Sequence, residues 1–198
     1  MANIPERRTA AVLYAELRNF TRLSEVLPPD KVLQLASDFF TLAAKAATAN
    51  GGKALPVQND ALAAAFTAGD KGTFAAQALK AAQGIQLEFG VLGENWKTEY
   101  GLPAAVSLGL HLGETVFGMV GAQGSQQFVA FGDCVSIAER LVHRARAGEI
   151  VISLELMKAL GATVKTLGAE ELPPLELGSK RPPVAIYGLL LESRLDFT

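Results

Sequence analysis

Two carboxylates, Glu16 and Asp60, lie at positions from which they could bind a metal ion together. Glu16 follows the short apolar run 10–14, a pattern typical of a buried strand. Asp60 lies in the turn between two further short segments, 53–57 and 61–66. Carboxylates at a strand end and at a facing turn can converge on a hard cation such as Mg²⁺ or Mn²⁺. The simpler alternative is a solvated strand-end carboxylate and an ordinary turn aspartate, because Asp is common in turns for its own reasons.

The helices and strands around these carboxylates are predicted from the positions of proline and glycine and from the spacing of the apolar residues. A helix is predicted to begin at 28–30, because proline suits a first turn and aspartate suits the positive end of a helix, and to end at 50–52. The segments that flank Asp60 form a predicted hairpin. Further helices are predicted over 70–92, 133–147 and 154–160, and further strands over 102–120, 126–131, 150–152 and 184–191.

This order of elements predicts an α+β fold with a ferredoxin-like (split βαβ) sheet. The 198 residues suit a single domain, 1–198, with a core over about 10–160 and a C-terminal strand extension over about 163–191. Hydrophobic residues make up 49% and charged residues 19% of the chain, a composition that permits a sizeable core and argues against disorder.

The net charge indicates which partners are not expected to bind, and the cysteine content indicates the redox compartment. The net charge of −2 gives no electrostatic reason to expect nucleic acid or an anionic membrane as partner. The single cysteine, Cys134, excludes an internal disulfide and suits a reducing cytoplasm. No apolar run reaches the roughly 18 residues that span a bilayer, and the polar start at 1–8 shows no signal peptide. We therefore expect a cytoplasmic location.

Six blocks in this sequence resemble the class III adenylate and guanylate cyclases, and they occur in the family's order and spacing. They are VLYAELRNFTRLSE (12–25), NGGKALPVQNDALAAAF (50–66), GLHLGETVFGMVG (109–121), FVAFGDCVSIAERL (128–141), GEIVISLELM (148–157) and LPPLELGSKRPPVAIYGL (172–189). The resemblance implies a cyclase-like fold. In that family two metal ions help the 3′-hydroxyl of a nucleoside triphosphate to attack its own α-phosphate, with loss of pyrophosphate.

The resemblance assigns the metal half of a cyclase site to two residues. Glu16 falls on the family's first metal-binding aspartate and Asp60 on the second. Glutamate keeps the charge but moves the carboxylate outward by about 1.5 Å, and misplacement on that scale can cost roughly 10²-fold in rate. Asn19 replaces a family glycine in the loop near the phosphates, where either a positive φ or a close backbone approach would favour glycine. Phe20 and Thr21 of that loop are retained.

The nucleotide half departs further from the family. Pro56 and Val129 occupy the base-reading positions, and neither side chain carries a hydrogen-bonding atom. Ser136 stands at the transition-state asparagine position, while Arg140 keeps the transition-state arginine. Loss of one preorganised donor typically costs about 10²–10³-fold. Lys180 or Arg181 in the tail lies near the family's basic triphosphate contact. Arg140 on a helix face is equally well explained as a surface arginine.

Three functions remain open at this stage. The first is a cyclase-like signalling domain that is catalytically impaired and acts as a dimerising or regulatory module, with Mg²⁺ or Mn²⁺ at a degraded site or with no cofactor. The second is the metal-bearing half of a heterodimeric cyclase. The third is an active cyclase that converts an unusual nucleoside triphosphate to a cyclic nucleotide.

Partners follow from the same resemblance. Cyclase domains pack head to tail, and the segment 112–121 resembles the family's dimerisation arm, so we expect a homodimer or a heterodimer with another cyclase chain. No chemical role is assigned to His111, which we expect to be structural, or to His143, which we expect to be a solvated helix residue.

Overall fold

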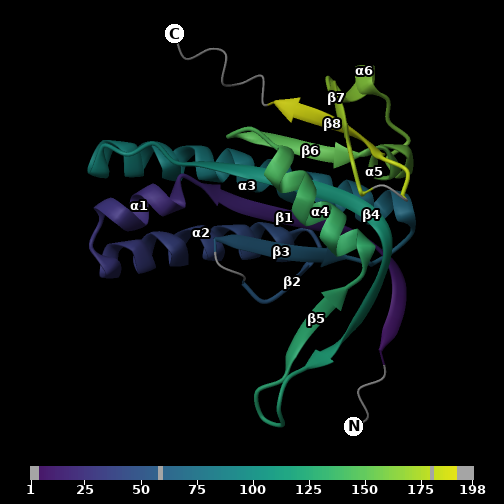
Figure 1. The fold of residues 1–198 in the computed structure, drawn as a ribbon, viewed down its shortest axis with the longest axis horizontal. Coiled ribbons are helices and arrows are strands. Elements are labelled where there is room, and N and C mark those ends of the chain that lie inside the picture. The colour runs from purple at the N-terminus through teal and green to yellow at the C-terminus, as the bar shows by residue number, and fades with distance from the viewer. Residues whose placement is uncertain (1–4, 58–59, 179–180, 191–198) are drawn as a thin grey trace.

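The computed structural model describes residues 5–57, 60–178 and 181–190 (Figure 1). In chain order the elements are β1 (Glu6–Arg18), α1 (Phe20–Val26), α2 (Pro29–Ala49), β2 (Lys53–Ala54), β3 (Ala61–Phe66), α3 (Lys71–Tyr100), β4 (Ala105–Val120), β5 (Gln127–Phe131), α4 (Asp133–Arg144), β6 (Glu149–Ser153), α5 (Leu154–Ala159), α6 (Val164–Leu167), β7 (Glu170–Leu175) and β8 (Val184–Leu190). None of the helices within the described ranges is long and apolar enough to cross a bilayer.

The strands of the described residues form one eight-stranded mixed sheet. Its order is β2-β3-β1-β4-β6-β8-β7, and β5 pairs with β4 outside this path. The central strand β1 is antiparallel to both β3 and β4, whereas β4 and β6 are parallel and are joined through α4. The predicted α+β architecture is therefore confirmed.

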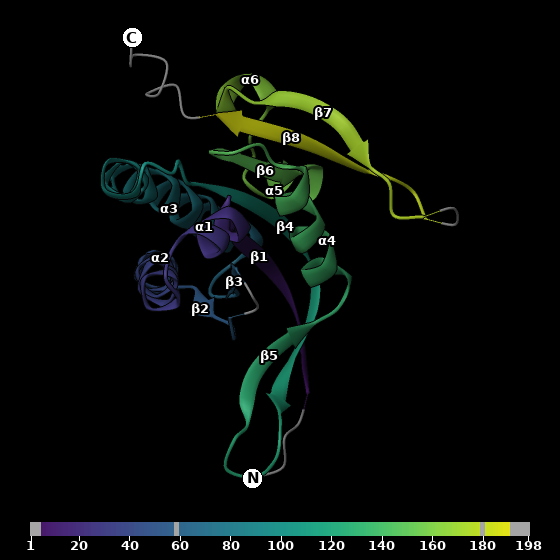
Figure 2. The ribbon, with the colours of Figure 1, turned by 60° about the vertical axis from the view of Figure 1, so that its left-hand side comes forward.

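Helices cover both faces of the sheet (Figure 2). The odd-numbered residues of β1 from 11 to 17 are buried against α2 and α3, and its even-numbered residues from 10 to 14 are buried against α4. Since successive strand residues point to opposite faces, this explains why the run 10–15 is apolar throughout. Glu16 and Arg18 continue the even-numbered series, so they lie on the face that α4 covers.

The β4–β5 hairpin projects from the body of the molecule in both ribbon views (Figures 1 and 2). β4 pairs with the whole length of β1, from Ala105 opposite Arg18 to Phe117 opposite Glu6, and its far end, Val116–Val120, pairs with β5. The rings of Phe117 and Phe128 stack across the hairpin with centroids 5.7 Å apart. The projecting hairpin is therefore held by strand pairing and by one aromatic contact.

Several predicted boundaries were wrong, each for a local reason. The helix predicted over 70–92 continues to Tyr100, where the left-handed Gly101 ends it. The strand predicted over 53–57 is reduced to Lys53–Ala54. α1 was not predicted, because its seven residues bury only Leu23 and show no periodicity.

The backbone of α4 lies close against β4 at Gly109. A Cβ atom at this position would overlap the backbone of Val142 and of Ala138 in α4. Since the overlap is with backbone rather than with a flexible side chain, the helix would have to move as a whole. Gly109 therefore sets the distance between α4 and the strand beneath it.

Replacement of this glycine tests the packing. We expect Gly109→Ala to lower the free energy of unfolding in urea by about 1–3 kcal/mol or more, because the added methyl group overpacks a helix–sheet contact. Gly84→Ala is the matched control: Gly84 lies within α3 with no atom within 4 Å of an added Cβ, so it should be neutral or stabilising by up to about 1 kcal/mol. Equal effects of the two changes would contradict this packing.

Candidate functional site

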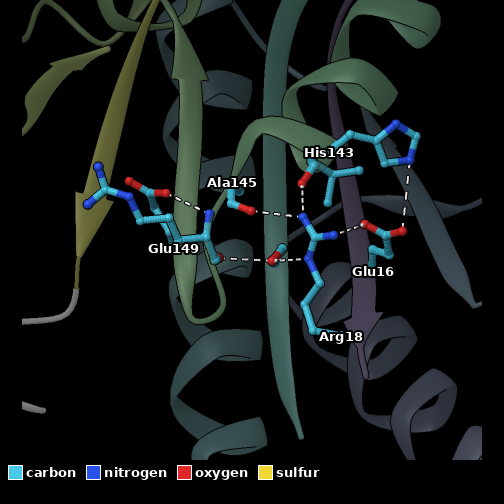
Figure 3. A network of polar contacts seen from close by, with 8 residues as sticks. Glu16, Arg18, His143, Ala145 and Glu149 are labelled. Carbon is cyan, nitrogen blue, oxygen red and sulfur yellow. Dashed lines mark hydrogen bonds and ion pairs between the residues drawn. The ribbon is translucent and has the colours of Figure 1, made fainter. Parts of the chain in front are cut away.

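The end of β1 carries an anchored guanidinium beside a carboxylate (Figure 3). Arg18 Nη1 lies 3.4 Å from Glu16 Oε2. Arg18 Nε donates to Ser107 Oγ at 2.7 Å, and Nη2 donates to the carbonyl oxygens of Val142 at 2.9 Å and Ala145 at 2.8 Å. One side chain thus ties β1 to β4 and to the C-terminal end of α4.

Elementary chemistry explains why an arginine suits this place. The last carbonyls of a helix have no donor within the helix, and the helix dipole makes this end negative. A planar guanidinium offers several donors in a fixed fork, which can serve two carbonyls and a hydroxyl together. The Glu16 side chain is only 15% exposed, and its Oε2 is buried without a hydrogen-bond partner. Arg18 is therefore the charge partner of a carboxylate that is largely removed from water.

His143 is a second basic group at this carboxylate. Its Nε2 lies 3.8 Å from Glu16 Oε1, although the ring is 58% exposed. The imidazole contributes a charge only when it is protonated. The sequence correctly indicates a solvated histidine in the last turn of α4. Its proximity to Glu16 could not be predicted from the sequence, because it depends on how α4 packs across β1.

Asp60 lies in the turn before β3, next to the end of β1. Its carbonyl oxygen accepts a hydrogen bond from the Leu17 N–H at 3.0 Å, and the residue is half-buried. The two carboxylate-bearing residues, Glu16 and Asp60, thus come from neighbouring strand ends, as the sequence predicts for their backbones.

The donor set does not fit a divalent cation as it is arranged. Oxygen ligands from both carboxylates would suit Mg²⁺ or Mn²⁺ by type, but the charge of Glu16 is already balanced by Arg18, which three hydrogen bonds hold in place. Within the described ranges no group of three or more His, Cys, Asp or Glu side chains is placed to hold a metal ion.

The loop after β1 has the backbone conformation of a glycine. Asn19 has φ 69° and ψ 13° and is the one non-glycine residue with positive φ in the described part of the chain. Its side-chain amide donates to the Pro103 carbonyl at 2.8 Å. Asn tolerates the left-handed region better than other side chains. Phe20, half-buried, and Thr21, exposed, begin α1 directly after it.

The predicted nucleotide-facing positions are spread over three elements. Pro56 follows β2 and is half-buried, and Val129 on β5 is half-buried opposite Gly118 of β4. Ser136 lies exposed in the first turn of α4, and Arg140 lies exposed one turn later. Arg140 does not stand free, because its guanidinium donates to the carbonyl oxygen of a residue in the chain's own tail, Glu176.

The tail makes a second contact with the start of α4. The guanidinium of Arg181 binds the Asp133 carboxylate through two hydrogen bonds, at 3.1 and 2.9 Å. Both side chains are exposed, so the pair contributes at most about 1 kcal/mol to stability. Lys180, predicted near a triphosphate contact, lies outside the described residues. These contacts join positions 48 residues apart, which no local sequence pattern could indicate.

Three buried titratable groups lie near α4. Burial lowers the pKa of His111, whose Nδ1 lies 2.8 Å from Ser153 Oγ. Burial also raises the pKa of Cys134 to about 11 and that of Tyr14 to about 12. Burial thus favours the uncharged form of all three groups. His111 is buried and hydrogen-bonded, as expected of a structural histidine.

Asn19 offers a direct test of the loop. Asn19→Ala should destabilise the chain by about 1–2 kcal/mol, because alanine disfavours positive φ and the bond to Pro103 is lost. Asn19→Gly loses the same bond without the conformational cost, and should leave the protein more stable than the alanine variant. Thermal unfolding of both variants checks this order, and an alanine variant as stable as the glycine variant would contradict the left-handed conformation.

The chain is similar to known nucleotide cyclases in sequence and structure. Residues 3–184 match the family described as the adenylate and guanylate cyclase catalytic domain. Adenylate cyclase 1 of Rhizobium meliloti (strain 1021) is 28% identical over 137 residues, which are 68% of this chain and 20% of that protein. Adenylate cyclase of Anabaena cylindrica is 27% identical over 135 residues, 68% of this chain and 27% of that protein. The chain thus spans about a fifth to a quarter of the length of these relatives.

Solved structures agree in fold over almost the whole chain. The adenylyl cyclase CyaB from P. aeruginosa superposes with a TM-score of 0.84 at 25% sequence identity, covering 96% of this chain and 97% of that one. The guanylyl cyclase Cya2 superposes with a TM-score of 0.82, also at 25% identity, covering 97% and 96%. The cyclase-like fold that the sequence blocks imply is thereby confirmed.

Proposed function

The chain belongs to the family of adenylate and guanylate cyclase catalytic domains, and we propose that it is a catalytically impaired member that acts as a dimerising or regulatory module. One observation carries the proposal: Pro56 and Val129 stand at the two positions that the resemblance assigns to base reading. A pocket reads a base edge through hydrogen bonds, and neither side chain has a donor or acceptor. Such a pocket has lost the means to select ATP or GTP.

The helix that would stabilise the transition state supports the same conclusion. Ser136 offers one short hydroxyl where the family's asparagine offers two amide donors. Arg140 donates to the Glu176 carbonyl of its own chain, so it would have to leave this partner before it could contact a phosphate. Each lost or displaced donor typically lowers kcat by about 10²–10³-fold.

The projecting hairpin supports the dimerising role. Val120 and Phe131 are 52% and 59% exposed at the ends of its strands, and Val57 before β3 is 48% exposed. Of these, Val120 and Phe131 lie on the projecting hairpin, and exposed apolar side chains there suit a contact with another chain. A second copy of the chain, packed head to tail, would bury them, and in this role the domain brings its partner chains together.

A second candidate, the metal-bearing half of a heterodimeric cyclase, is favoured by the position of Asp60. The hydrogen bond from Leu17 N to the Asp60 carbonyl keeps this carboxylate-bearing turn at the end of β1. In such a heterodimer the partner chain would supply the base-reading and transition-state groups, and this chain would supply Asp60.

An activity assay distinguishes these functions. We expect the purified chain to form no cyclic nucleotide from ATP or GTP with Mn²⁺, because base selection and one transition-state donor are missing. Measurable turnover, with these or with another nucleoside triphosphate, would overturn the proposal. In a mixture with an intact cyclase chain, activity that Asp60→Ala abolishes would support the heterodimer, while activity indifferent to Asp60→Ala would exclude it.

The oligomeric state is a separate test. Sedimentation velocity should give a species of about twice the 20.9 kDa chain mass, and Phe131→Asp should shift it toward monomer because it places a charge in an apolar interface. Leu33→Asp is the matched control, since Leu33 is 72% exposed on α2, away from the hairpin. A wild-type monomer, or equal effects of the two changes, would contradict a hairpin-mediated dimer.

A further inference from the structure

We propose that Arg18 serves as a built-in cation at the first metal position: its guanidinium neutralises Glu16, excludes a divalent ion from that carboxylate, and clamps the C-terminal end of α4 to the sheet without any metal. The inference rests on the proposed function only for identifying Glu16 as the family's metal position. The contacts that support it are all within the chain and involve no nucleotide.

The first support is that each of the three guanidinium nitrogens of Arg18 has a partner. Nε and Nη2 make three hydrogen bonds, to one hydroxyl and two carbonyl oxygens, and Nη1 faces Glu16 Oε2 at 3.4 Å. The Arg18 side chain is 31% exposed. To leave Glu16, Arg18 would have to give up three hydrogen bonds and take a donor away from two helix-end carbonyls, of which the Val142 carbonyl would keep only the Ala145 N–H at 3.2 Å.

The second support is that the partner hydroxyl is itself fixed. Ser107 is completely buried, and its Oγ donates to the Arg146 carbonyl at 2.9 Å while it accepts from Arg18. The Arg146 N–H in turn donates to Glu149 Oε2 at 2.7 Å. Figure 3 shows this chain of contacts running from Glu16 to Glu149, across the sheet and under the end of α4. Arg18 is therefore one member of a continuous network rather than a mobile surface side chain.

The third support is electrostatic. A divalent ion bound to Glu16 Oε2 would lie within a few ångströms of the guanidinium, and like charges at that separation repel strongly where water is scarce. The other oxygen, Oε1, faces His143 Nε2 at 3.8 Å. Glu16 therefore already has a cation beside Oε2, and a metal ion there would have to displace Arg18. Asp60 alone would be left as a ligand.

Manganese binding tests the exclusion. Free Mn²⁺ is measured by electron paramagnetic resonance with the wild type, Glu16→Gln, Arg18→Met and the double variant. We expect wild type and Glu16→Gln to bind Mn²⁺ equally, within about twofold. Arg18→Met should bind at least about tenfold more tightly, and the double variant should lose this gain. Arg7→Met is the matched control, because Arg7 pairs with Glu114 near the other end of β1 at 3.3 Å with both side chains exposed.

Two results would overturn the inference. One is Mn²⁺ binding by the wild type that Glu16→Gln abolishes, and the other is a folded Arg18→Met variant that binds Mn²⁺ no more tightly than the wild type does. If Arg18→Met does not fold, the Mn²⁺ affinities of the wild type and Glu16→Gln still test whether Glu16 binds the ion. Cyclase turnover measured on the same wild-type sample keeps the two proposals apart. Glu16-dependent binding without turnover contradicts only this inference, and turnover without such binding contradicts only the proposed function.

Thermal unfolding tests separately whether Arg18 holds the end of α4 to the sheet. Arg18→Met should lower Tm by about 5 °C or more, because it takes the nearest cation from a largely buried carboxylate and a donor from each of two helix-end carbonyls. Arg7→Met should change Tm by no more than about 2 °C. Addition of Mn²⁺ should leave the wild-type Tm unchanged. Equal losses for the two arginine variants would show that Arg18 clamps nothing.

Discussion

A guanidinium in a largely buried place needs several partners at once, and the arrangement around Arg18 follows from that requirement. Its donors meet a hydroxyl on β4, two carbonyls at the end of α4 and a carboxylate on its own strand. Removal of Arg18 would take the nearest cation from Glu16 and a donor from each of the two carbonyls. Arg18 consequently fixes the end of α4 against the end of β1 and balances the charge of Glu16 at the same time. The helix that carries Ser136 and Arg140 is thus held at one end by Arg18.

The other constraints on α4 act along its length. Gly109 lets the helix backbone approach β4 without an intervening side chain, and the tail pairs with its first turns through Arg181 and Glu176. A helix fixed at its start, middle and end offers its exposed residues in one orientation. In an active cyclase such fixation would serve catalysis by preorganising donors for the transition state. In this chain it presents a serine and an arginine already bonded to its own tail.

Much of the fold could be predicted from the sequence, because it depends on local signals. Apolar runs such as 10–14 mark buried strands, glycines end helices, and the cyclase-like blocks fix the order of elements. The alternation of β1 even indicates that Glu16 and Arg18 share a face, since they are two residues apart. Asn19 in place of a glycine also pointed correctly to a left-handed loop.

The rest depends on contacts between distant parts of the chain. The carbonyls that hold Arg18 lie 124 and 127 residues further along, and nothing in their local sequence indicates a guanidinium partner. For the same reason the pairing of Glu16 with Arg18 could not be separated beforehand from metal binding: a strand-end carboxylate has the same pattern in both cases. α1 escaped prediction because it buries a single side chain.

The most direct test of the central claim, that the first metal position is already filled by an arginine, is the broadening of backbone amide resonances by substoichiometric Mn²⁺ in solution. A paramagnetic ion held by Glu16 would selectively erase the amide signals of Leu17 and its neighbours at the end of β1. With Arg18 in that place, these signals should survive at the same intensity as those of residues in the far half of the sheet. Because Asp60 lies beside Leu17, the Glu16→Gln variant is the control: a selective loss at low Mn²⁺ that Glu16→Gln reverses would contradict the account.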